Sequence, residues 1–126
     1  EMGAHELTMP EDTAISPQNL AMIESVKEYI NKNYMDAQLS LTSVGEEFFI
    51  TEVYLSKLFK RATGENFSKY VEGVRMQHAK ELLEQGKKVS EAAELVGYNS
   101  PQVFRRAWKR YYGNTPSEST RYNNDN

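Results

Sequence analysis

The chain has 126 residues, of which 39% are hydrophobic, so it is long enough for one domain or two very small ones with a real core. It contains no cysteine, which excludes disulfides, thiolate metal sites and a cysteine nucleophile, and suits a reducing compartment. Because no apolar run approaches the ~18 residues that span a bilayer and no signal peptide is visible, we expect a cytoplasmic chain without membrane contact.

The charge of the chain is unevenly distributed. The net charge is −3, but residues 1–50 carry nine acidic and two basic side chains, whereas residues 51–126 carry nine acidic and thirteen basic ones. Residues 100–113 hold four basic side chains and no acidic one. Binding to a polyanion depends on the local field, because charges beyond a Debye length of ~8 Å are largely screened. The second half can therefore bind nucleic acid, although the acidic first half should weaken non-specific affinity.

The chain begins with a segment that has no periodicity. Residues 1–18 contain Gly3, Pro10 and Pro17, and we expect them to be a linker or a vector-derived remnant, mostly disordered. A helix over about 18–34 follows, with apolar residues at helical spacing: Leu20, Ile23, Val26, Ile30 and Tyr34.

Two shorter helices are expected next. Ser40 is a candidate N-cap for the first, although Ser43 and Glu46 also have capping-box spacing, which leaves its start open by one turn. Its inward residues are Leu41, Val44 and Phe48. The second helix, about 51–63, opens at Thr51 and ends at a C′ glycine, and its inward residues are Leu55, Leu58, Phe59 and Ala62.

The longest helical pattern runs over residues 66–85 and stops at Gly86. Its apolar stripe comprises Phe67, Tyr70, Val71, Val74, His78, Leu82 and Leu83. A short helix follows that ends at Gly97 and carries Val89, Ala92, Ala93 and Val96 inward.

Ser100 and Pro101 then give a strong start signal for a helix over about 100–112. Phe104, Ala107, Trp108 and Tyr111 face inward in this helix, and Gly113 ends it. Thr115 and Pro116 repeat the start signal for a last short helix, and a frayed tail covers 123–126. No segment alternates as a strand should, so the pattern predicts an all-α fold of about seven helices.

Two stretches of the chain repeat each other: "YLSKLFKRATGENF" from Tyr54 and "VFRRAWKRYYGNTP" from Val103, 49 positions apart. Each contains an aromatic residue followed by Lys-Arg, with a glycine three residues on. The short helices that precede them align at an offset of 48. A short helix, a tight turn and a helix with an exposed basic face are typical of a helix-turn-helix.

The pattern therefore predicts two helix-turn-helix units joined by a connector helix. A connector of about 20 residues spans ~30 Å at ~1.5 Å per residue. Two recognition helices on one face of B-DNA lie about one helical turn, roughly 34 Å, apart. The connector length is compatible with that spacing.

The segments "YLSKLFKRATGENFSKYV…R…AKELL" and "VSEAAELVGYNSPQVFRRAWKRYYGNTPSE" resemble the DNA-binding domain of AraC/XylS-type bacterial transcription regulators. The resemblance covers about residues 20–122. It implies a domain over 19–122, with a first unit at 19–64, the connector at 66–85 and a second unit at 88–122. It also implies binding to adjacent major-groove segments of promoter DNA, usually to activate transcription.

In relatives, the early outward positions of the two recognition helices contact bases. Carried over, the base-reading residues are Val53, Ser56 and Lys57 in the first unit and Gln102, Arg105 and Arg106 in the second. The phosphate-binding residues implied in the same way are Lys60, Arg61, Lys109 and Arg110.

This sequence departs from the family pattern at four positions. Gly45 stands where a small alanine is usual, and Phe49 stands at a turn position where glycine is frequent. Glycine at position 45 costs helix stability by ~1 kcal/mol, and the departures together predict a less rigid first unit. Ala92 loses core volume and Trp108 adds it.

The chemistry of the side chains leaves simpler explanations open. Arginine pairs with guanine and glutamine with adenine, but a cluster of charges can also be only a solvated face. Lys57 can bind guanine or only a phosphate, and Val53 can contact a thymine methyl or nothing. The late cations of each helix also stabilise its negative end. For Arg75, on the connector, an ion pair with a neighbouring acid is favoured over contact with DNA.

Two other classes of function compete with DNA binding. A helical protein-interaction module could bind an acidic partner through the basic faces. An enzyme is disfavoured, since no nucleophile–base pair, phosphate-binding glycine loop or carboxylate pair is evident. His5 and His78 have no second ligand at metal spacing, so we expect neither a metal nor a cofactor.

A regulator also needs an input, and none is visible in the chain. We therefore expect the chain to be the carboxy-terminal part of a longer protein, with its sensor and any dimerisation surface elsewhere. The expected partners are double-stranded promoter DNA and RNA polymerase, and the isolated domain should be a monomer.

Overall fold

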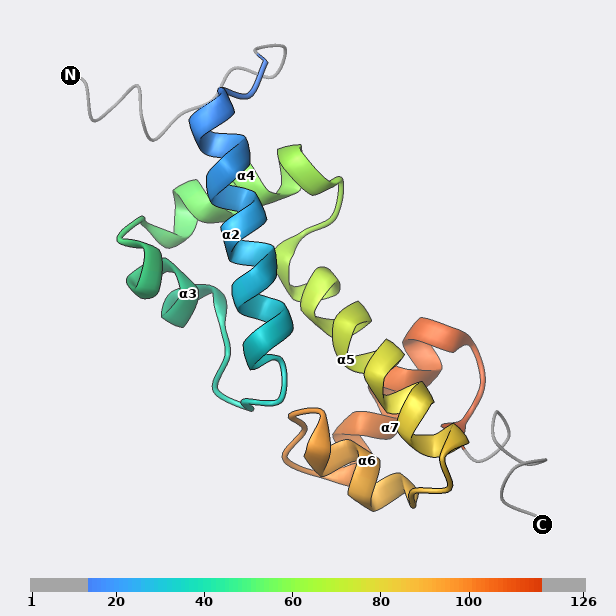
Figure 1. Ribbon diagram of the computed structural model, residues 1–126. Helices are drawn as coiled ribbons and strands as arrows, with labels where there is room; N and C mark the ends of the chain where they lie inside the picture. Colours follow the sequence, from blue (N-terminus) through green and yellow to red (C-terminus); the bar gives the residue numbers. More distant parts are fainter. Residues whose placement is uncertain (1–13, 117–126) are drawn as a thin grey trace. The chain divides into compact units, whose positions relative to one another are not determined.

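The computed structural model describes residues 14–116, and in this range it contains six helices and no strand (Figure 1). The helices are α2 (Pro17–Asn33), α3 (Leu41–Phe48), α4 (Glu52–Thr63), α5 (Phe67–Glu84), α6 (Val89–Leu95) and α7 (Pro101–Tyr112). The all-α prediction is confirmed. The helix expected after Thr115 and Pro116 lies mainly on residues 117–122, outside the described residues.

The chain divides into two compact units, and the division falls inside α5. The first unit comprises the described residues up to Lys32 together with Leu39–Tyr70, and the second comprises Asn33–Gln38 and the residues from Val71 onward. The helix expected to be a connector therefore belongs to the first unit at its start and to the second unit for the rest of its length. The loop Asn33–Gln38 also belongs to the second unit, although it joins α2 to α3.

The core of the first unit is formed by apolar residues at helical spacing on α2, α3, α4 and the start of α5. The buried side chains are Ile23, Val26, Ile30, Val44, Leu55, Leu58, Phe59 and Phe67. The ring of Phe59 packs edge-on against Phe67 at 5.6 Å and Tyr70 at 5.2 Å between ring centroids. Leu20, expected inward, is instead 46% exposed, because it lies in the first turn of α2, outside this core.

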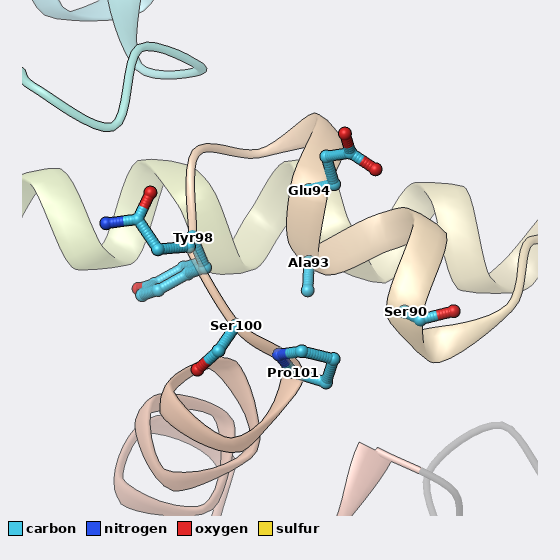
Figure 2. A pocket seen from close by; sticks show the side chains of 7 residues that line it. Ser90, Ala93, Glu94, Tyr98, Ser100 and Pro101 are labelled. Atoms are coloured by element: carbon cyan, nitrogen blue, oxygen red, sulfur yellow. The ribbon is translucent and has the colours of Figure 1, made fainter.

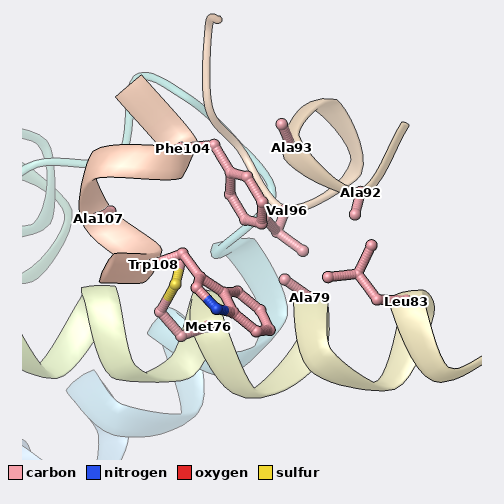
Figure 3. Close-up of a cluster of buried hydrophobic side chains, with 9 residues drawn as sticks. All are labelled: Met76, Ala79, Leu83, Ala92, Ala93, Val96, Phe104, Ala107 and Trp108. Carbon is pink, nitrogen blue, oxygen red and sulfur yellow. The ribbon is translucent and has the colours of Figure 1, made fainter. Parts of the chain in front are cut away.

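The second unit packs α6 and α7 against the later part of α5 around the indole of Trp108 (Figure 3). The buried cluster comprises Met76, Ala79, Leu83, Ala92, Ala93, Val96, Phe104, Ala107 and Trp108. The volume lost at Ala92 and the volume added at Trp108 therefore fall in one core. The predicted stripe of α5 was partly wrong, since Met76 and Ala79 are fully buried whereas His78 is only half-buried.

The end of α7 corrects one inward assignment. Tyr111 is 37% exposed, and Tyr112 takes the inward position beside it. The Tyr112 ring lies 4.4 Å from the Trp108 ring, and its hydroxyl donates to the Met76 carbonyl at 3.2 Å. Two adjacent tyrosines are separated by ~100° on a helix, so local periodicity alone did not decide which one packs.

The helix starts follow the capping residues of the sequence. The Ser40 hydroxyl accepts from the Ser43 amide, and the Ser43 hydroxyl accepts from the Ser40 amide, both at 3.0 Å. This reciprocal box places the start of α3 at Leu41, so the alternative start at Ser43 is wrong. Thr51 caps α4 through the Tyr54 amide at 3.1 Å.

The turn after α3 explains both departures of the first unit. A Cβ on Gly45 would lie 2.9 Å from the Ile50 carbonyl oxygen, so glycine is required there by the close approach of the turn. Phe49 takes the left-handed conformation, with φ 60°, that glycine usually supplies. Despite both departures, α3 is a continuous helix with Val44 fully buried.

Arg75 has a structural role of a different kind from the expected ion pair. Its Nε donates to the Tyr34 carbonyl at 2.8 Å, and its Nη2 donates to the Asp36 carbonyl at 2.9 Å. The guanidinium carbon lies 5.4 Å from the centre of the Tyr98 ring. Within the described residues, the partners of Arg75 are thus backbone carbonyls and an aromatic ring, and they hold the loop Asn33–Gln38 in the second unit.

Candidate nucleic-acid interface

The helix α4 buries one face and exposes the other. Leu55, Leu58 and Phe59 are buried in the first unit. Of the residues predicted to contact DNA, Val53 is 59% exposed, Lys57 and Lys60 are exposed, and Ser56 and Arg61 are half-buried. The spacing of 53, 57 and 60 places the three exposed side chains along one stripe of the helix.

The helix α7 has the same division, with a more basic exposed face. Phe104, Ala107 and Trp108 are fully or almost fully buried. The predicted residues Gln102, Arg105, Arg106, Lys109 and Arg110 are all exposed. The sequence-predicted site residues therefore fall into two groups, one on each helix.

The two helices are held by matching end structures. The Ser100 hydroxyl accepts from the Val103 amide at 3.2 Å, with Pro101 in the first turn, as Thr51 does for α4. Gly64 and Gly113 end the helices at φ 84° and 86°, where a side chain would be strained. Each basic helix thus has a defined first turn and a defined end.

The electrostatics of the two helices differ. The helix α4 carries three cations and Glu52, whereas α7 carries four cations and no acid. One of those four, Arg110, donates from Nη2 to the Glu72 carboxylate at 2.8 Å. This hydrogen bond and the charge of Glu72 raise the pKa of Arg110. The other three cations of α7, together with Lys57 and Lys60 of α4, form no ion pair within residues 14–116.

Sequence reasoning missed three features of these surfaces. Glu72 lies 38 residues before Arg110, and no local pattern connects the two. Glu52 is the first residue of α4, and its carboxylate accepts a hydrogen bond from the Thr42 hydroxyl at 2.6 Å. Phe49 is 93% exposed, and its only signal in the sequence was its position where glycine is frequent.

A pocket of about 430 Å³ lies between α6 and the first turn of α7 (Figure 2). Its lining residues are Ser90, Ala93, Glu94, Tyr98, Asn99, Ser100 and Pro101. This lining contains one carboxylate and no Lys, Arg or His side chain. No three metal-ligating side chains come together in the part of the chain that the structure describes.

Comparisons with known proteins agree with this geometry. A family model described as a helix-turn-helix domain matches residues 44–122. The transcriptional regulatory protein YesN of Bacillus subtilis, itself uncharacterised, is 38% identical over 117 residues, which cover 87% of this chain and 32% of YesN. This chain therefore spans about a third of the length of that curated relative.

Solved structures show the same fold. The C-terminal domain of AraT, a response regulator from Geobacillus stearothermophilus, superposes with a TM-score of 0.79 at 32% identity, over 87% of this chain and 88% of that domain. The DNA-binding domain of the global transcriptional factor AdpA, solved with a target DNA, superposes with a TM-score of 0.74 over 79% of this chain and 90% of that one. At 20% identity, this second likeness concerns the fold alone.

Two helix-turn-helix units with basic second helices define a DNA-binding domain of a transcription regulator. The chain belongs to the AraC/XylS family of helix-turn-helix regulators. The predicted family and the prediction that the chain is not an enzyme are confirmed by its relatives, which are transcription regulators. No helix in residues 14–116 combines the length and the apolar composition needed to cross a membrane.

Proposed function

We propose that this domain binds promoter DNA sequence-specifically, with α4 and α7 in adjacent major-groove segments. The observation that carries the proposal is the division of each helix into a buried apolar face and an exposed face that carries basic side chains. A helix fixed by its apolar face and capped at its first turn presents its early outward side chains in one geometry. That preorganisation is what base recognition in the major groove requires.

The second unit is the more discriminating one. Gln102 precedes Arg105 by three residues and Arg106 by four, so the three side chains share the exposed face of α7. Arginine binds guanine O6 and N7 with two hydrogen bonds, and glutamine binds adenine N6 and N7 in the same way. Each such pair contributes ~1–3 kcal/mol of discrimination.

The first unit has weaker means of discrimination. Val53 can contact a thymine methyl, Lys57 can bind guanine, and Ser56 has no preferred base. Glu52, in the first turn of the same helix, lowers the local positive potential. We expect α4 to tolerate more sequences than α7.

The late cations neutralise phosphates. Lys60 and Lys109 are exposed and have no ion-pair partner within residues 14–116. We assign the same role to Arg61 and Arg110. To contact a phosphate, Arg110 must either break its ion pair with Glu72 or bind both groups at once. Each phosphate contact contributes about −0.9 to the slope of log K against log salt concentration.

The biological setting that we propose follows from the family. The domain acts as a monomer in the cytoplasm, within a longer regulator that activates transcription by contacting RNA polymerase. The likeness to the C-terminal domain of a response regulator supports a phosphorylated receiver as the missing input.

Selection from random duplexes tests the proposal directly. We expect two boxes about one helical turn apart, with a sharper consensus in the box bound by α7. A single box, or no enrichment above random DNA in dilute salt, would contradict the two-helix proposal.

A further inference from the structure

Phe49, in the turn between α3 and α4, contributes almost nothing to the core of the first unit. The side chain of Phe49 is 93% exposed, more than any other large apolar side chain that is exposed in residues 14–116. It is also the one described non-glycine residue with a positive φ, at 60°. An aromatic residue therefore occupies a backbone conformation that disfavours side chains, and it gains almost no burial there.

The equivalent turn of the second unit shows the contrast. Gly97 lies there at φ 104°, and a Cβ would meet the Tyr34 carbonyl oxygen at 2.6 Å and Arg75 Nε at 3.1 Å. The second turn therefore requires glycine for packing. The first turn leaves room for a side chain, so packing permits Phe49 without requiring it. A role outside its own unit accounts for its presence.

The position of Phe49 indicates where that role lies. Phe49 precedes Val53, which is 59% exposed in the first turn of α4, by four residues. Val53 in turn begins the exposed stripe that continues to Lys57 and Lys60. We call Phe49 and Val53 the apolar pair: Phe49 lies two residues before Thr51, the N-cap of α4, and Val53 lies in the first turn of that helix.

The chemistry of the apolar pair restricts its partner. Glu47 and Glu52, both exposed, flank Phe49 along the chain and disfavour a phosphate there. The uncharged apolar group that the major groove offers is the thymine methyl, and phenylalanine is among the side chains that contact it. We propose that the apolar pair packs against thymine methyl groups, so that the first unit selects thymine mainly through Phe49. This inference rests on the proposed function and names a specificity residue outside the recognition helix.

Replacing thymine by deoxyuridine tests the contact, because uracil differs from thymine only by the methyl group. The probe is the duplex selected by the wild-type chain, with each thymine replaced in turn, and affinity is measured by fluorescence anisotropy. Wild type should lose up to roughly tenfold at one or two thymines, if ~50 Å² of apolar surface leaves water on binding. Phe49→Ala should lose a similar factor on the unmodified duplex and should no longer respond to deoxyuridine at those positions.

Three variants control for other causes. Phe49→Gly keeps the backbone geometry without strain, so it should lose the same affinity and melt no lower than wild type. Val53→Ala should reduce the response to deoxyuridine without abolishing it. Leu20 is also an exposed apolar residue but lies on α2, away from the apolar pair in the chain, so Leu20→Ala should leave DNA affinity unchanged.

The outcomes separate this inference from the proposed function. If wild type selects a motif but Phe49→Ala and Phe49→Gly bind it as tightly and keep the full response to deoxyuridine, the thymine contact is wrong and the proposed function stands. If wild type selects no motif, the proposed function fails first. Unchanged DNA affinity together with lost binding to RNA polymerase would assign the ring to a protein and overturn the thymine contact.

Discussion

Replacing Glu72 by glutamine should strengthen binding to DNA of any sequence. Arg110 Nη2 lies 2.8 Å from Glu72 Oε1, and the arginine side chain is 65% exposed whereas the glutamate side chain is 18% exposed. Arg110 is therefore close to solvent but has its charge neutralised by a carboxylate. Glutamine keeps a hydrogen-bond acceptor at the same place and removes the competing charge.

The size of the effect follows from counterion release. One additional phosphate contact steepens the slope of log K against log salt concentration by ~0.9. At ~0.1 M salt this corresponds to about 1.2 kcal/mol, or roughly eightfold in affinity. The arginine is exposed, so loss of the ion pair should change the free energy of unfolding by less than ~1 kcal/mol.

The assay is fluorescence anisotropy on a short random duplex at several salt concentrations. Glu72→Gln should give the steeper slope, and Arg110→Ala should cancel the gain in that background. Glu81→Gln, which removes an exposed carboxylate from the same helix, is the matched control. The reasoning is refuted if Glu72→Gln leaves the salt slope unchanged while Arg110→Ala alone makes it shallower. Arg110 would then bind phosphate with Glu72 in place.

Three further predictions concern recognition, packing and pH. Arg105→Ala should reduce discrimination at one or two base positions by ~1–3 kcal/mol. Lys109→Ala should instead weaken binding to specific and random duplexes alike. Equal losses of affinity for both variants on both duplexes would count against base contacts by Arg105. Gly97→Ala should lower the free energy of unfolding by at least ~2 kcal/mol, because φ is 104° and its Cβ would lie 2.6 Å from a carbonyl oxygen. Gly64→Ala, with open space around its Cβ, should lower the free energy of unfolding by only about 1 kcal/mol. Chemical denaturation that finds Gly64→Ala the more destabilising of the two would contradict this expectation. Burial raises the pKa of Tyr98 although Arg75 opposes the shift, so stability should be complete below pH ~10 and fall as pH rises from there through the folded-state pKa. Tyr98→Phe should make the alkaline decline shallower in thermal melts, and an unchanged decline would exclude Tyr98 as its source.

The parts of the fold that depend on local sequence were predictable. Ser100 with Pro101 marked the start of α7, and Gly113 marked its end, because caps and glycine stops act over three or four residues. The inward face of α7 followed from the spacing of Phe104 and Trp108. The exposed faces that form the candidate site were the complement of these buried ones, so they could be predicted from the same spacing.

Features that depend on contacts between distant residues were not predictable. Arg75 was expected to pair with a carboxylate, but it binds backbone carbonyls 39 and 41 residues away. The ion pair of Arg110 joins residues 38 apart on two helices. Both contacts arise only after α5 packs into the second unit, and no local pattern encodes them.

The turn of the first unit was misjudged for another reason. Helix propensity predicts that Gly45 destabilises α3, because propensity describes a helix isolated in solution. In the structure the Ile50 carbonyl oxygen approaches closely enough that a Cβ would lie at 2.9 Å. The left-handed conformation of Phe49 belongs to the same turn, so two apparent defects are one local arrangement.

Guanine methylation interference on the selected duplex tests the central claim most directly, because N7 lies in the major groove. If α4 and α7 occupy adjacent major-groove segments, interfering guanines should form two groups about 10 bp apart on one face, and Arg105→Ala should abolish interference only in one group. One group of guanines, or interference that Arg105→Ala weakens equally in both, would contradict the account.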